Sequence, residues 1–190
     1  RERLFAQLDS ARTNRVIWLT GPPGAGKTSL VATYLARRKL RSLWYQLDES
    51  DIDAASFFYH FDVAIAEQSK RKAPALPRLT PEYQAGLPAF IKRYAEAAFQ
   101  SLGKEFLVVF DGYQDIPAQS QFHELMRDAL EVIPPGGCVV IISRADPPPI
   151  MARLRVRQGM TVMGWDDLRL TREESDAIVA SRGHHPGEPA

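Results

Sequence analysis

One stretch of the chain, Gly21–Thr28, constrains its fold more than any other feature. It reads Gly-Pro-Pro-Gly-Ala-Gly-Lys-Thr and matches the phosphate-loop pattern G-x-x-x-x-G-K-[ST] at every fixed position. The apolar run Val16–Leu19 precedes it, and apolar residues at helical spacing follow it between Leu30 and Leu35. Phosphate-binding loops require a glycine-rich turn that ends a buried strand and opens a helix. The sequence therefore predicts an α/β fold built around a site for nucleotide phosphates.

The chemistry of phosphate binding explains which residue types stand in this loop. Pro22 and Pro23 carry no N–H, so the phosphate-facing amides must come from about residues 24–29, where glycines allow positive φ. The N-terminus of the following helix adds partial positive charge. Lys27 supplies a point charge for the terminal phosphates, and Thr28 supplies a hydroxyl ligand for Mg²⁺. The predicted nucleotide-binding residues are Gly21, Gly24, Ala25, Gly26, Lys27, Thr28 and Ser29.

Apolar runs alternate with stretches of helical periodicity along the rest of the chain. We expect strands at 16–19, 42–47, 106–110, 139–142 and 160–163. We expect helices around 30–41, 57–65, 87–98 and 122–130, with starts marked by Asp51–Asp53, Pro88 and Ser120, and a further helix opening at the capping box Thr171–Glu174. Strands that are apolar throughout and separated by helices indicate a parallel sheet covered on both faces. The predicted fold is a three-layer α/β P-loop NTPase whose parallel five-stranded sheet has the order 5-1-4-3-2.

The strand at 106–110 ends in Asp111, where a Walker B acid must lie to reach Mg²⁺. We therefore predict Asp111 and Thr28 as the metal ligands. The next residue is Gly112, a position where many P-loop ATPases of the extra-strand division carry a second carboxylate that polarises the attacking water. Glycine cannot do this, and the next acid, Asp115, is expected beyond the strand. We expect weak or absent hydrolysis, which favours a nucleotide-gated switch over a fast enzyme.

The strand at 139–142 leads directly into Ser143 and Arg144. In the sheet order above it lies beside the P-loop strand, so Arg144 could sense the γ-phosphate with a guanidinium group that suits phosphate geometry. The predicted catalytic residues are Lys27, Asp111 and Arg144. A rival interpretation takes Ser143–Asp146 as a degenerate guanine-specificity motif, N-K-x-D. However, the segment Asp111–Gln114 lacks the glycine of the GTPase element D-x-x-G.

The composition of the chain limits the class of protein and the kinds of partner that fit this site. The chain has 190 residues, of which 45% are hydrophobic and 25% charged, as in ordinary globular domains. Lys and Arg number 24 against 23 acids, and a net charge of +1 favours neither a nucleic-acid nor a membrane partner. Cys138 is the only cysteine, which excludes a disulfide within the chain and disfavours a thiolate zinc site. The sequence shows no membrane span and no signal peptide, so we expect a cytoplasmic protein.

The chain is expected to form one P-loop nucleotide-binding domain over residues 1–180. Residues 181–190 are polar and are expected to form a tail or the start of a linker. The numbering starts at Arg1 without a methionine, and the chain stops in a loop-like Gly-Glu-Pro-Ala. We therefore expect a piece of a longer protein, so that some functional parts lie outside it.

Other clusters have plainer explanations. The acids in Asp48–Asp53 lack the glycine and the closing glutamate of a calcium loop, so we interpret them as helix and turn caps. The basic residues in 70–78 are interpreted as a solvated loop. The alternating arginines in 153–157 could share one face of a strand, either as salt-bridged surface or as an arginine finger for a neighbouring subunit. Cys138 is expected to be a buried, inert thiol.

The sequence resembles a known group, the nucleotide-binding domain of the MalT-like (large LuxR-type) STAND ATPases. The resemblance extends over roughly residues 1–180. The P-loop occurs in many families, and the later Ile-Ser-Arg and Asp-Leu-Arg-Leu-Thr elements make the resemblance more specific to this group. The segments that carry it are Gly21–Leu30, Leu47–Asp51, Val109–Gln114, Ile142–Arg144 and Asp167–Glu174.

The resemblance implies ATP or ADP with Mg²⁺ as the ligand, with Lys27 and Thr28 on phosphate and metal, Asp111 as the Walker B acid and Arg144 as sensor. It implies that ADP holds a closed monomer and that ATP with an inducer permits self-association. It also implies a winged-helix domain, a helical-repeat sensor and often a DNA-binding helix-turn-helix elsewhere in the protein, so that DNA is bound only through that effector. The family usually carries a second acid where this chain has Gly112.

Two other classes of function compete with this interpretation. The first is an actively hydrolysing enzyme, such as an AAA+ motor or a small-molecule kinase. A kinase should carry an acceptor pocket and a base near the P-loop, and steady turnover conflicts with Gly112. The second is a direct nucleic-acid-binding module, which the charge of +1 and the lack of a helix-turn-helix disfavour for this chain.

Overall fold

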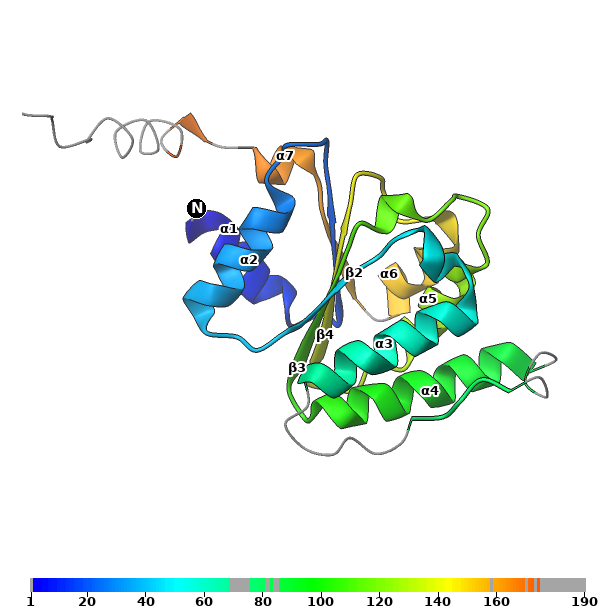
Figure 1. The fold of residues 1–190 in the computed structure, drawn as a ribbon. Helices are drawn as coiled ribbons and strands as arrows, with labels where there is room; N and C mark the ends of the chain where they lie inside the picture. The colour runs from blue at the N-terminus through cyan, green and yellow to red at the C-terminus, as the bar shows by residue number, and fades with distance from the viewer. Residues whose placement is uncertain are drawn as a thin grey trace, which may run out of the picture.

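The computed structural model describes residues 2–68, 76–80, 83, 86–157, 159–169, 171, 172 and 174. Helices and strands alternate along the chain, except that α3 is followed directly by α4 (Figure 1). The strands are β1 (Val16–Thr20), β2 (Leu43–Gln46), β3 (Phe106–Asp111), β4 (Gly137–Ser143) and β5 (Met160–Met163). The α-helices are α1 (Glu2–Ala11), α2 (Lys27–Arg38), α3 (Ala54–Gln68), α4 (Leu87–Leu102), α5 (Phe122–Glu131), α6 (Ala152–Arg157) and α7 (Trp165–Leu168). Short 3₁₀ turns are η1 (Glu49–Ile52), η3 (Tyr113–Asp115) and η4 (Pro149–Met151).

The strands form one five-stranded parallel sheet in the order β2-β3-β4-β1-β5. Read from the other edge, this is the order 5-1-4-3-2, so the predicted topology is confirmed. In register, Thr20 at the end of β1 lies opposite Ser143, and Asp111 at the end of β3 lies opposite Ile142. Because the strands are parallel, the carboxyl ends of β1, β3 and β4 meet at one edge, where open α/β sheets bind ligands.

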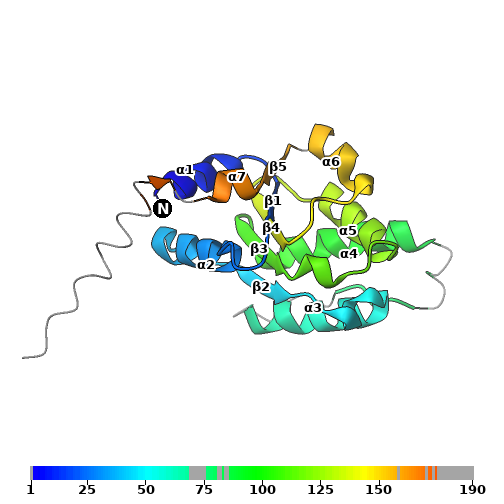
Figure 2. The same ribbon diagram turned by 90° about the horizontal axis from the view of Figure 1, so that it is seen from above.

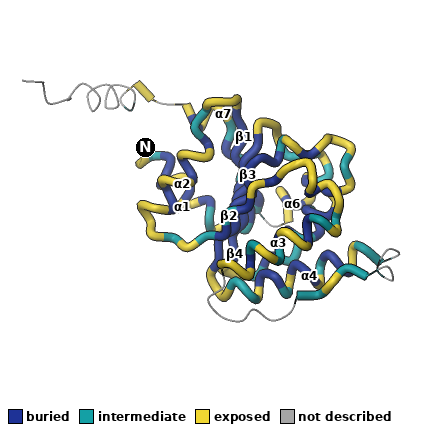
Figure 3. Tube along the Cα trace, viewed as in Figure 1, coloured by how far each residue is buried: buried dark blue, intermediate teal, exposed yellow. Residues whose placement is uncertain are grey.

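Helices cover both faces of the sheet, which confirms the predicted three layers. Helices α1, α2 and α7 lie on one face and α3 to α6 on the other (Figure 2). Successive side chains of β3 point to opposite faces of the sheet and contribute to the cores on both faces. Val108 and Phe110 belong to the core under α3 to α5, whereas Leu107 and Val109 belong to the core under α1 and α2. The sheet is therefore the most buried part of the molecule (Figure 3).

Short polar signals set the helix starts. Asp53 precedes α3, and its Oδ2 accepts a hydrogen bond of 2.8 Å from the Ser56 N–H. Pro88 stands in the first turn of α4, where its missing N–H leaves no helical bond unmade. The Ser120 hydroxyl accepts a bond of 3.1 Å from the Phe122 N–H at the start of α5. The predicted starts are thus confirmed within a residue or two.

The acids of Asp48–Asp53 serve as caps, as expected. Asp48 Oδ1 accepts a bond of 2.7 Å from the Ser50 N–H, and Asp51 Oδ2 accepts one of 2.9 Å from the Asp48 N–H. The other carboxylate oxygen of Asp51 accepts the Tyr45 hydroxyl at 2.7 Å. Burial and this carboxylate raise the pKa of Tyr45 well above its usual range. This acidic cluster therefore closes the connection from β2 to α3 and does not form a calcium loop.

One prediction about secondary structure is wrong, and two helices were missed. The arginines Arg153, Arg155 and Arg157 do not share one face of a strand, because they lie on α6. Prolines before η4 start a helical turn, and Met151 and Leu154 are buried at helical spacing on its inner side. None of the three arginines is ion-paired with a carboxylate that the structure describes. The missed helices are the four-residue α7 and also α1, although Leu4, Phe5, Leu8 and Ala11 mark the buried face of α1.

The expectations for Thr171 and Cys138 concern residues that the structure describes, whereas those for the basic loop and the tail concern residues that it does not describe. The capping box at Thr171 is confirmed, because its N–H donates to Glu174 Oε2 at 3.0 Å and its hydroxyl accepts from the Glu174 N–H at 3.2 Å. Cys138 is buried, and burial raises the pKa of its thiol to about 12. Residues 70–72 and the tail 181–190 lie outside the described residues. None of the helices described here is long and apolar enough to cross a bilayer.

Candidate functional site

The phosphate loop joins β1 to α2 and turns on two glycines. Gly24 has a φ of 78° and Gly26 a φ of 75°, in the left-handed region that glycine adopts readily. The Ala25 N–H donates to the Pro22 carbonyl at 3.2 Å, and the Leu30 N–H donates to the Gly26 carbonyl at 2.8 Å. The loop thus closes tightly and places the first turn of α2 at the edge where the strands end.

Lys27 is the first residue of α2, and its ammonium group folds back over the loop. Nζ donates to the Gly21 carbonyl at 2.7 Å and to the Pro22 carbonyl at 3.1 Å. Burial lowers the pKa of Lys27, the positive charge of Arg144 lowers it further, and Asp111 acts in the opposite direction. A partly desolvated ammonium beside a guanidinium is a cationic site, which suits an anionic ligand such as a polyphosphate.

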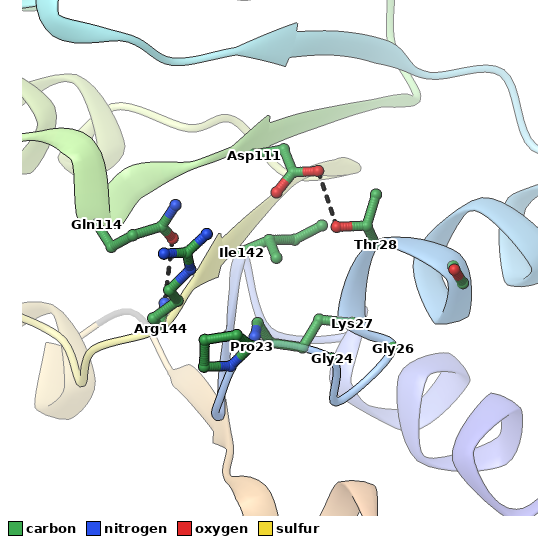
Figure 4. Close-up of a pocket in the computed structure, with 10 residues that line it drawn as sticks. Pro23, Gly24, Gly26, Lys27, Thr28, Asp111, Gln114, Ile142 and Arg144 are labelled. Atoms are coloured by element: carbon green, nitrogen blue, oxygen red, sulfur yellow. Dashed lines mark hydrogen bonds between the residues drawn. The ribbon is translucent and has the colours of Figure 1, made fainter.

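Thr28 faces the end of β3. Its Oγ1 donates to Asp111 Oδ2 at 3.0 Å (Figure 4). The main chain of Asp111 is fixed in turn, since its carbonyl accepts the Leu47 N–H at 2.8 Å and Gln46 Nε2 at 3.2 Å. A hydroxyl and a carboxylate are hard oxygen donors, and Mg²⁺ is usually held by one or two carboxylates together with phosphate oxygens and water. The two side chains therefore fit a Mg²⁺–nucleotide ligand.

A metal bound without nucleotide is not supported by the donor set. Among the residues that the structure describes, no group of three or more His, Cys, Asp or Glu side chains could hold a metal ion. A Mg²⁺ ion at Thr28 and Asp111 would thus need oxygens from a phosphate chain to complete its octahedral shell.

A cavity of about 290 Å³ lies over the carboxyl ends of β1, β3 and β4. Its lining residues are Pro23, Gly24, Gly26, Lys27, Thr28, Ser29, Asp111, Gln114, Ile142 and Arg144. All of the residues predicted as catalytic line it, and so do most of those predicted to bind nucleotide. Gly21 and Ala25 do not line it, and a Cβ added at Gly21 would be 3.6 Å from Ala25 Cβ and from Leu168 Cδ1.

The backbone explains why position 112 carries no side chain. Gly112 has a φ of 85°. A Cβ there would collide with Gln46 Nε2 and would lie 2.9 Å from the Leu47 carbonyl oxygen and 3.2 Å from Asp115 Oδ2. A carboxylate therefore cannot be introduced at this position without moving β2. Asp115, the next acid along the chain, is not among the cavity-lining residues.

Three lining residues, Pro23, Gln114 and Ile142, were not among the site residues predicted from the sequence. Gln114 lies on the turn η3 just after β3, and its Oε1 accepts a hydrogen bond of 3.1 Å from the Arg144 N–H. Its position shortly after the Walker B strand was the available signal. A carboxylate, and not an amide, is the side chain expected to act on water at this place in the sequence.

The comparisons with known proteins agree with this geometry. The model of the NACHT domain matches residues 15–164, which reach from the start of β1 to the end of β5 and include all residues that line the cavity. The chain belongs to the NACHT family. NACHT domains are P-loop NTPases, so nucleotide binding, typically with Mg²⁺, follows for this NACHT domain.

Curated relatives of the NACHT domain are much longer than the chain. It is 31% identical over 192 residues to the HTH-type transcriptional regulator MalT of Cronobacter sakazakii, with 100% of this chain and 21% of that protein covered. It is 32% identical over 190 residues to the MalT regulator of Serratia proteamaculans, with coverages of 99% and 21%. The chain thus spans about a fifth of the length of these relatives.

Solved structures support the fold. A signal transduction ATPase with numerous domains (STAND) with a tetratricopeptide repeat sensor, from Pyrococcus horikoshii, superposes with a TM-score of 0.62 at 16% identity, covering 98% of this chain and 26% of that one. Cdc6p from Pyrobaculum aerophilum superposes with a TM-score of 0.56 at 18% identity, covering 96% of this chain and 48% of that one. At such identities the likeness concerns the fold alone.

Proposed function

We propose that this NACHT domain is the ATP/ADP-binding switch of a bacterial signal-transducing transcriptional regulator. The observation that carries the proposal is the meeting of Lys27, Thr28, Asp111 and Arg144 around one cavity, with Thr28 and Asp111 hydrogen-bonded at 3.0 Å. The transcriptional part of the proposal comes from the relatives, which are named as HTH-type regulators.

Each side chain has a separate role in this proposal. Lys27 and the N-terminus of α2 neutralise the phosphate chain. Thr28 and Asp111 hold Mg²⁺, which supplies further charge neutralisation when it is bound with the nucleotide. Arg144 stands at the end of β4, across the cavity from Thr28, and reads the terminal phosphate (Figure 4).

Hydrolysis is proposed to be slow or absent. The position where a second carboxylate would activate water is Gly112, and its backbone leaves no room for a side chain. A bound triphosphate then persists long enough to act as a signal. This property suits a switch, and it disfavours the alternative of an actively hydrolysing, AAA+-like ATPase unrelated to transcription.

The rest of the protein is proposed to read the nucleotide state. The ADP form would be a closed monomer, and the ATP form with an inducer would self-associate. A winged-helix domain and a sensor domain would lie in the remaining four fifths of the relatives' length, and DNA would be bound only through an effector domain there. We place this regulator in the cytoplasm, without a membrane partner.

The proposal predicts adenine-selective binding that depends on Lys27. In calorimetric titrations with Mg²⁺, ADP and ATP should bind and GTP should bind more weakly. Lys27→Ala should weaken the binding of both adenine nucleotides by about tenfold to a hundredfold, because it removes a charge-assisted contact to phosphate. Phosphate release over an hour should be negligible.

Lys104→Ala is the matched control, since Lys104 is exposed and does not line the cavity. Its affinities should equal those of the wild type. Preference for GTP, brisk steady turnover of ATP, or equal losses in Lys27→Ala and Lys104→Ala would contradict the proposal.

A further inference from the structure

The main chain around Arg144 is held by side chains from β1, from the end of β4 and from the turn η3 that follows β3. Gln114, just after β3, accepts the Arg144 N–H on Oε1 at 3.1 Å. Trp18 of β1 donates its indole N–H to the Ala145 carbonyl at 3.0 Å. Ser143, the last residue of β4, accepts the Ala145 N–H on Oγ at 3.1 Å. We call Trp18, Gln114 and Ser143 the Arg144 clamp.

The members of the Arg144 clamp are themselves fixed. Trp18 is fully buried, and the edge of its ring system meets Tyr113, with centroids 4.8 Å apart. The Tyr113 hydroxyl is hydrogen-bonded to His123 Nδ1 at 2.9 Å. Gln114 Nε2 donates to Asp115 Oδ2 at 3.2 Å, which orients the amide so that its oxygen faces Arg144. The clamp is therefore anchored in the core on one side and in η3 on the other.

The guanidinium of Arg144, by contrast, has no carboxylate to orient it. No ion pair joins it to an acid in the part of the chain that the structure describes. It lines the cavity, and its charge is close enough to lower the pKa of Lys27. The direction of this side chain toward the cavity thus depends on how its backbone is held (Figure 4).

We propose that Trp18 and Gln114 are positioning residues that enable Arg144 to distinguish a nucleoside triphosphate from a diphosphate. Neither side chain needs to touch the terminal phosphate. Each fixes the main chain from which the guanidinium reaches it, and preorganisation of this kind decides how much of a charge-assisted contact is realised. This inference rests on the proposed function, because it deepens the sensor role of Arg144.

The test compares how tightly the purified protein binds ADP and an ATP analogue with a non-hydrolysable β–γ bridge, both with Mg²⁺. Gln114→Met removes the acceptor and keeps the length of the side chain. Trp18→Phe removes the indole N–H and keeps an aromatic ring. Each variant should lower the affinity for the triphosphate relative to ADP by about threefold to tenfold, and Arg144→Met by about tenfold or more. ADP affinity should fall by less than triphosphate affinity, because ADP lacks the phosphate that Arg144 is proposed to contact.

Matched controls separate positioning from general damage. Gln100→Met and Trp44→Phe make the same chemical changes outside the cavity and should leave the triphosphate-to-diphosphate ratio unchanged. A double-mutant cycle is the sharper readout: once Arg144→Met is present, adding Gln114→Met should not lower the ratio further, because both changes act through one guanidinium. The cycle remains informative even if Trp18→Phe does not fold.

The outcomes are distinguishable from failure of the proposed function. Additive effects of Gln114→Met and Arg144→Met, or an unchanged ratio in Gln114→Met, would overturn the positioning role while adenine-nucleotide binding stands. A ratio that is unchanged in Arg144→Met would overturn it as well. Absence of any nucleotide binding by the wild-type protein would instead remove the proposed function itself.

Discussion

At the scale of single residues, the backbone at Gly112 limits the catalytic groups that the site can hold. Its φ of 85° and its closeness to Gln46 and to the Leu47 carbonyl exclude every residue with a Cβ unless β2 shifts. The departure from the usual acid is therefore built into the packing between β2 and β3. It is not a local change that one substitution can reverse.

Gly112→Ala should consequently destabilise the protein more than backbone strain alone does. Gly24→Ala is the matched comparison, because Gly24 has a similar φ of 78° but an added Cβ there meets nothing within 4 Å. Strain alone should cost Gly24→Ala about 1–2 kcal/mol of unfolding free energy. Urea denaturation should show a larger loss for Gly112→Ala. Equal losses, or faster ATP hydrolysis by Gly112→Asp, would contradict this account.

The sequence predicts site residues well where one motif places them. Lys27 and Thr28 are tied to the P-loop, and Asp111 and Arg144 stand at strand ends, where parallel topology brings side chains together. The hydrogen bonds by which Gln114 and Trp18 hold the main chain around Arg144 could not be predicted from the sequence, for a physical reason. Their partners lie 30 and 127 residues away in sequence, and such bonds depend on the packed sheet and not on local pattern.

At the scale of elements, apolar runs and helical stripes predict the strands and the longer helices. Two of the errors concern the short helices α6 and α7, whereas the missed helix α1 is as long as α5, which was predicted. Helix α6 spans Ala152–Arg157, too short for periodicity to distinguish it from a strand, and only the burial of Leu154 and of Met151 in η4 settles its face. The observed ends of β2 and β4 also differ from the predicted ends by one or two residues, because pairing with the neighbouring strand decides where each strand ends.

Capping at the start of α3 offers a test at this scale. Asp53→Ala should lower the free energy of unfolding by about 0.5–2 kcal/mol, because the Ser56 N–H loses its acceptor. Asp53→Ser keeps a capping oxygen and should lose much less. Nucleotide affinity should stay unchanged in both variants, since Asp53 does not line the nucleotide cavity. Equal stability of Asp53→Ala and wild type in urea denaturation would refute the capping role.

At the scale of the whole molecule, the sheet order places three strand ends around one cavity and helices on both faces. The sequence predicts this arrangement, because its strands are apolar throughout and are separated by helices. The arrangement also agrees with membership of the NACHT family. The domain boundary expected near residue 180 stays a prediction. The proposed regulatory role also depends on domains that are proposed to lie outside the chain, which spans 21% of the length of its MalT relatives.

The central claim is that Thr28 and Asp111 hold Mg²⁺ together with nucleotide phosphates, and the dependence of ADP affinity on Mg²⁺ tests it most directly. Calorimetric titrations with Mg²⁺ and with EDTA should show that Mg²⁺ tightens binding to the wild-type protein by about tenfold or more. Asp111→Asn should lose most of this dependence, whereas Asp146→Asn, outside the cavity, should keep it. An Asp111→Asn variant with wild-type dependence on Mg²⁺, or a wild-type protein that binds no nucleotide, would contradict the account.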